Sequence, residues 1–148
     1  MADASDVLIE LWKEQREQAR QTETQRATLT NIVILVVAAG LGFVAQKGLD
    51  PSALAVTIPI ALLGAYGAIA CMKFRERSAL HGLQALHLRV KLGNLHPGLE
   101  IEPGWADTYR TQEARYPRLN KIRLYALWVS LHIGITTVGC VLTLLALL

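Results

Sequence analysis

The side chains whose types and spacing could do chemistry are concentrated near the C-terminus of this 148-residue chain. Four polar or sulfur-containing side chains recur there every three or four residues, which places them on one helix face: His132, Thr136, Cys140 and Thr143. An imidazole and hydroxyl groups along such a face can line a water-filled path, relay protons or hydrogen-bond to a neighbouring helix. The stripe is therefore a candidate pore lining or a candidate bundle interior, and the sequence leaves both open.

Other chemistries lack the residues that they need. His81, His87 and His96 are not spaced as metal ligands, and the chain contains no phosphate-binding loop, zinc-protease motif or nucleophile elbow. Cys140 and His132 are two helical turns apart, too far for a thiol and its base to share a hydrogen bond. We therefore expect no enzymatic activity, no catalytic residue, no metal and no cofactor.

Three apolar runs position the stripe. Residues 29–45 and 52–72 contain no charged side chain, and 124–148 contains none unless His132 is protonated. At a rise of about 1.5 Å per residue, 51–72 would cross the roughly 30 Å of bilayer hydrocarbon, 29–45 would cover somewhat less, and 124–148 would cross with tilt. Between the first two runs, Gly48 can end one helix, Asp50 can cap the next and Pro51 fits its first turn. These features predict a helical hairpin with almost no loop.

Small side chains recur along both helices of this hairpin. In the first helix the row is Asn31, Ala38, Gly42 and Ala45, and in the second it is Thr57, Ala61, Gly64, Ala68 and Cys71. Small residues let helix backbones approach closely in lipid. We expect the two rows to face each other within one chain, the alternative being contact with a neighbouring subunit.

Helical extensions flank the spans. No Pro or Gly occurs from residue 7 to residue 39, which predicts one long helix from the N-terminal extension into the first span. The second span should continue to about residue 92, residues 94–104 should form an extended turn region, and 105–116 a short helix. The predicted fold is an all-α membrane protein with three transmembrane helices and cytosolic helical extensions. Its parts are a cytosolic N-terminal helix (1–28), a transmembrane hairpin (29–72), a basic cytosolic segment (73–123) and a third transmembrane helix (124–148).

The distribution of basic residues predicts the orientation. Four Lys or Arg precede the first span, one lies in the hairpin turn, ten lie between the second and third spans, and none follow the third. Lys and Arg accumulate on the cytosolic side of a membrane. We therefore expect a multi-pass protein of the plasma (inner) membrane, with a cytosolic N-terminus and the C-terminus outside.

The layout also carries a family resemblance. A cytosolic N-terminal helix, a tight two-span hairpin and a charged helix beginning Lys73-Phe74-Arg75-Glu76-Arg77 resemble the SLATT-type small membrane effectors of bacterial antiviral systems, over residues 5–93. The resemblance implies an oligomeric, pore-forming effector controlled by nucleotide or oligonucleotide signals from a partner enzyme. The third span departs from the plain two-span pattern, which leaves open which helix would line a pore. No site residues carry over.

Two functions follow as expectations. The first is a homo-oligomeric membrane effector that forms an ion-conducting or membrane-disrupting pore in antiviral defence, because repeated small subunits can enclose a path. The alternative is a nonconducting membrane anchor or assembly subunit that recruits a cytosolic partner.

The cytosolic segments suggest a ligand. Residues 73–123 have an excess of five positive charges and residues 1–27 an excess of two negative charges, so the two segments should pack together. We expect an anionic nucleotide or short nucleic acid to bind near five basic residues: Arg110, Arg115, Arg118, Lys121 and Arg123. The alternative is that these charges only set the orientation and contact anionic lipid headgroups.

Overall fold

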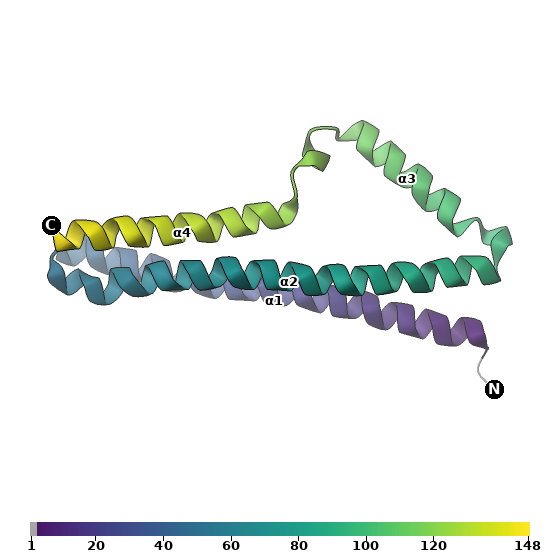
Figure 1. Cartoon of the computed structure of the whole chain (residues 1–148), viewed down its shortest axis with the longest axis horizontal. Helices are drawn as coiled ribbons and strands as arrows, with labels where there is room; N and C mark the ends of the chain where they lie inside the picture. Colours follow the sequence, from purple (N-terminus) through teal and green to yellow (C-terminus); the bar gives the residue numbers. More distant parts are fainter. Residues whose placement is uncertain (1–2) are drawn as a thin grey trace. The chain divides into compact units, whose positions relative to one another are not determined.

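The computed structural model describes residues 3–148, and within that range every regular element is a helix (Figure 1). The four α-helices are α1 (Ala4–Lys47), α2 (Leu54–Leu95), α3 (Ile101–Arg115) and α4 (Leu124–Leu147). Short 3-10 turns occupy Pro51–Ala53, Pro97–Leu99 and Leu119–Lys121. Three helical segments are long and apolar enough to cross a membrane: Ala4–Lys47, Pro51–Leu95 and Leu124–Leu147. The all-helical prediction with three candidate spans is therefore confirmed.

The turn between α1 and α2 uses the residues that the sequence predicted. Gly48 has φ +92°, a left-handed conformation that other residues rarely adopt, and its N–H donates to the carbonyl of Val44 over 2.9 Å. Asp50 then accepts hydrogen bonds from the hydroxyl and the backbone N–H of Ser52, and these hold the pKa of its carboxyl below the ordinary value. Pro51 occupies the first turn, where no N–H is needed.

The predicted turn region at 94–104 is mostly wrong. α2 continues to Leu95, one 3-10 turn follows, and α3 begins at Ile101 rather than at Trp105. Pro103 lies in the first turn of α3, where the backbone N–H groups have no partner within the helix, so proline does not interrupt it. The break itself falls at Glu100, which is left-handed with φ 47°.

The chain divides into two compact units, and α1 and α2 each contribute to both. The apolar unit comprises residues 24–75 and 124–148, and the polar unit comprises residues 3–23 and 76–123. Because residues 3–23 share a unit with 76–123, the expected packing of the N-terminal segment against the basic segment is confirmed.

The apolar unit is held together by aliphatic and small residues of α1, α2 and α4. Val33 and Val37 of α1 form a buried cluster with Ile60 of α2, and Ile135 of α4 packs against it. The α2–α4 contact is close enough that a Cβ atom added at Gly139 would lie 2.4 Å from the backbone nitrogen of Ala61. Small side chains therefore allow α2 and α4 to pack closely together.

The prediction that the two small-residue rows face each other is wrong. All four members of the α1 row are exposed, and a Cβ atom added at Gly42 meets nothing within 4 Å. The α2 row instead faces α4, where Gly64 lies against Thr136 and Thr57 is hydrogen-bonded to Thr143. The third apolar run was not paired with the hairpin in the sequence interpretation, which is why the partner of the α2 row was missed.

The polar unit is joined by hydrogen bonds between distant segments. Gln15 of α1 pairs with His81 of α2 over 2.8 Å, and Ser5 pairs with His96 over 2.9 Å. These contacts align the start of α1 with the second half of α2.

Candidate functional site

Polar residues of α1 and α4 meet beside α2 in a cluster inside the apolar unit. His132 of α4 is fully buried, and its Nε2 shares a 3.1 Å hydrogen bond with Oγ1 of Thr30 of α1, which is also fully buried. Gly67 of α2 closes the third side, because a Cβ atom there would lie 2.1 Å from Nδ1 of His132. One residue from each span therefore forms the centre of the site.

Two aromatic rings extend this cluster along α4. The guanidinium of Arg26 lies 5.4 Å from the ring centroid of Trp128, and that of Arg75 lies 3.7 Å from the ring of Tyr125. Arg26 is only 7% exposed, and the face of the indole stabilises its charge. Trp128 and Tyr125 therefore bind cations of α1 and α2, respectively.

The remaining stripe residues differ in their surroundings. The Thr143 hydroxyl lies 2.9 Å from that of Thr57, which joins α4 to α2, and the Thr136 hydroxyl donates to the carbonyl of His132. Cys140 is exposed on α4, whereas Cys71 is buried on α2. The structure therefore brings His132, Thr136 and Thr143 to the interior of one chain, and it leaves Cys140 outside.

The cluster retains unused hydrogen-bonding capacity. Among residues 3–148, three buried nitrogen atoms have no partner: Nε of Arg26, Nε1 of Trp128 and Nδ1 of His132. An internal water molecule is the usual partner of such atoms. The same described residues contain no group of three side chains suited to a metal. The arrangement can join the three helices and hold a water molecule, and the full burial of Thr30 and His132 separates its centre from solvent.

The basic residues expected to bind an anion lie on the surface of the polar unit. Arg110 and Arg115 belong to α3, and the other three follow it: Arg118, Lys121 and Arg123. All five are exposed, and none forms a salt bridge with another residue of the range 3–148. Arg115 alone has an aromatic partner, the ring of Tyr116 at 5.7 Å, beside a groove of about 360 Å³.

Sequence reasoning missed the partners of the stripe. Thr30 and Gly67 carry no distinctive sequence pattern, Thr57 belongs to the small-residue row of the second helix, and Arg26 is one of the four basic residues that precede the first apolar run. One signal was available: Arg26 and Thr30 are four residues apart, so they share a face of α1 that could meet a polar face of another span. Which span supplies that face depends on contacts more than 100 residues apart in sequence.

Comparisons of the chain with protein-family models, with curated protein sequences and with solved structures found no match.

Proposed function

We propose that the protein is a homo-oligomeric membrane effector whose copies meet along the outer face of α1 and form an ion-conducting or membrane-disrupting path. The observation that carries this proposal is the exposure of the Asn31 side chain on α1. Its amide is exposed on α1, next to the apolar segment that would lie in lipid, and no hydrogen bond joins it to another residue in the range 3–148. A polar side chain in a span is costly in lipid and ordinarily faces another helix or water.

The residues that share this face favour a second copy. Ala38, Gly42 and Ala45 lie within about 40° of Asn31 around the helix, since each residue turns the helix by about 100°. Their small side chains would let a neighbouring backbone approach closely. The aliphatic residues that hold the subunit together, Val33 and Val37, lie on the opposite side of α1.

The buried stripe changes which helix would line the path. His132, Thr136 and Thr143 are engaged within the subunit, so we assign the helix nearest the oligomer axis to α1 and not to α4. The resemblance to SLATT-type effectors supports a pore-forming role and, with it, a role in antiviral defence prompted by a signalling enzyme. The charge distribution supports a cytosolic N-terminus in the plasma (inner) membrane.

A nonconducting anchor or assembly subunit is the second candidate. The burial of His132 favours it, because this strongly polar residue then serves the cohesion of one subunit rather than transport. In that case the polar unit would recruit a cytosolic partner.

Disulfide cross-linking tests the proposed interface. In a Cys71→Ser, Cys140→Ser background, Ala38→Cys should give a covalent dimer on mild oxidation in membranes. Val36→Cys is the matched control, because Val36 is 49% exposed at the same depth but lies about 160° around the helix from Ala38. Equal cross-linking of the two variants, or none from Ala38→Cys, would refute the interface.

A further inference from the structure

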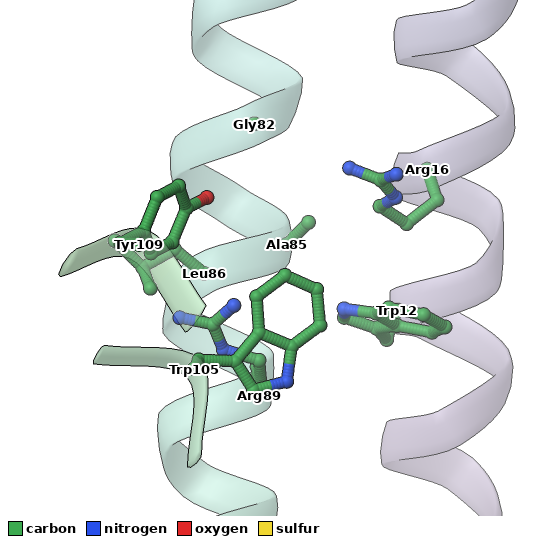
Figure 2. A pocket seen from close by; sticks show the side chains of 8 residues that line it. All are labelled: Trp12, Arg16, Gly82, Ala85, Leu86, Arg89, Trp105 and Tyr109. Carbon is green, nitrogen blue, oxygen red and sulfur yellow. The ribbon is translucent and has the colours of Figure 1, made fainter. Parts of the chain in front are cut away.

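A cleft of about 440 Å³ opens in the polar unit among α1, α2 and α3 (Figure 2). Its volume falls within the roughly 300–1,000 Å³ of small-molecule sites. Aromatic and cationic side chains dominate its walls: Trp12 and Arg16 from α1, Arg89 from α2, and Trp105 and Tyr109 from α3. Figure 2 shows the indoles of Trp12 and Trp105 extending toward one another across the cleft.

Arg89 is held in place by its neighbours. Its Nε donates to one carboxylate oxygen of Glu102 over 2.9 Å and its Nη2 to the other over 3.3 Å. The same guanidinium lies 4.5 Å from the ring centroid of Trp105. A guanidinium has five N–H donors, so three remain for a ligand after these two bonds. Arg89 therefore presents donors at a fixed position beside an aromatic face.

Arg16 supplies the uncompensated charge. It is exposed and forms no ion pair or hydrogen bond with another residue in the range 3–148. Figure 2 shows its guanidinium extending from α1 toward α2 on the side of Gly82. The cleft is open on that side, because a Cβ atom added at Gly82 would meet nothing within 4 Å. Glu102 balances the charge of Arg89 but not that of Arg16, and no Asp or Glu is among the described residues that line the cleft.

We propose that this cleft binds a small anion that carries a planar aromatic ring, of the nucleoside phosphate class. The ring stacks on the indoles of Trp12 and Trp105, because aromatic side chains are the usual platform for nucleobases. The phosphate meets Arg16 and the free N–H groups of Arg89, because guanidinium matches phosphate geometry. The site differs from the basic surface of Arg110 to Arg123, and it does not depend on whether the protein forms a pore.

Two simpler ligands fit less well. Inorganic phosphate or a lipid headgroup would use the arginines and leave the indoles without a partner. A neutral apolar ligand would use the indoles and leave the charge of Arg16 unmatched. A ligand with both an anionic group and an aromatic ring would contact the arginines and the indoles together.

Calorimetric titration of the full-length protein in nanodiscs of zwitterionic lipid tests the proposal. The probes are AMP, GMP, CMP and UMP, with inorganic phosphate and adenosine as partial ligands. At least one nucleotide should bind at least tenfold more tightly than either partial ligand and should quench tryptophan fluorescence. Absence of nucleotide binding at about 1 mM would overturn the proposal. Equal affinity for phosphate alone, as expected of a general anion or headgroup site, would also overturn it.

Variants separate the cleft from the rest of the surface. Arg16→Gln should weaken nucleotide binding about tenfold or more, because a charged hydrogen bond is lost at an exposed residue on which the fold does not depend. Trp105→Leu should weaken it similarly, and Trp105→Phe should retain most of it. Arg110→Gln is the control, because it removes the same charge from an exposed position of α3 outside the cleft, and it should leave affinity unchanged. Equal losses from Arg16→Gln and Arg110→Gln would overturn the assignment.

Discussion

The imidazole of His132 lies directly against Gly67, so that a Cβ atom at residue 67 would be 2.1 Å from Nδ1 of the ring. His132 is fully buried and bonded to Thr30, so the ring has little room to move. α4 is thus fitted against α2 at a position where only glycine leaves space.

The first prediction follows from this contact. Gly67→Ala should destabilise the protein by about 1–3 kcal/mol, the usual cost of forcing extra volume into a packed interior. The measurement is unfolding in mixed micelles, followed by circular dichroism. Gly134→Ala is the control, because a Cβ atom there meets nothing within 4 Å, and it should be neutral or stabilising by up to about 1 kcal/mol. Equal effects from both substitutions would refute the contact.

The second prediction concerns the hydrogen bond between Thr30 and His132. In a double-mutant cycle with Thr30→Val and His132→Leu, the coupling energy should be about 0.6 kcal/mol and should not exceed about 1.7 kcal/mol, the range found for hydrogen bonds between membrane helices. Thr28→Val is the control, because Thr28 is an exposed threonine of the same helix. It should show no coupling to His132→Leu. Additive effects of Thr30→Val and His132→Leu would mean that the bond contributes nothing.

These contacts separate the features that the sequence alone predicts from those that depend on tertiary packing. Uncharged runs and the Gly48, Asp50 and Pro51 turn are local signals, so the helices and the hairpin were predicted. The inward-facing roles of Thr30 and Gly67 could not be predicted, because they depend on tertiary contacts with His132 of α4. The cleft was missed for the same reason, because Trp12 and Trp105 come from segments 93 residues apart. The spacing of four residues between Trp12 and Arg16, and between Trp105 and Tyr109, was a local sign of it.

The third prediction concerns Asp50 and pH. Hydrogen bonds from Ser52 lower its pKa in the folded protein, so the capping interaction is fully present above the ordinary carboxyl pKa and is lost as pH falls through the lower folded pKa. Hydrogen exchange at the Ser52 amide should therefore lose protection in acid. Asp50→Ala should remove this protection at neutral pH, and Asp50→Asn should keep most of it, because an amide oxygen can also accept the bond. Unchanged exchange in Asp50→Ala would exclude the cap.

The fourth prediction is the orientation. In a background without native cysteines, Asp3→Cys should react with a membrane-impermeant maleimide only after the cell is opened, and Leu49→Cys should react in intact cells. Both positions are exposed, and they flank the span of α1. A cytosolic N-terminus is expected from the concentration of Lys and Arg on the same side of the apolar runs. Labelling of both residues from the same side would show that α1 does not cross the membrane.

The central claim is that copies of this chain form a conducting path near the exposed face of α1. The most direct measurement is the current across a planar bilayer that contains the purified protein, recorded with and without the nucleotides named above. The account predicts discrete current steps, which Asn31→Leu should reduce or abolish and Thr137→Val, at an exposed polar position of α4, should leave unchanged. No current under any of these conditions, from protein that is folded and inserted, would contradict the account and favour a nonconducting anchor.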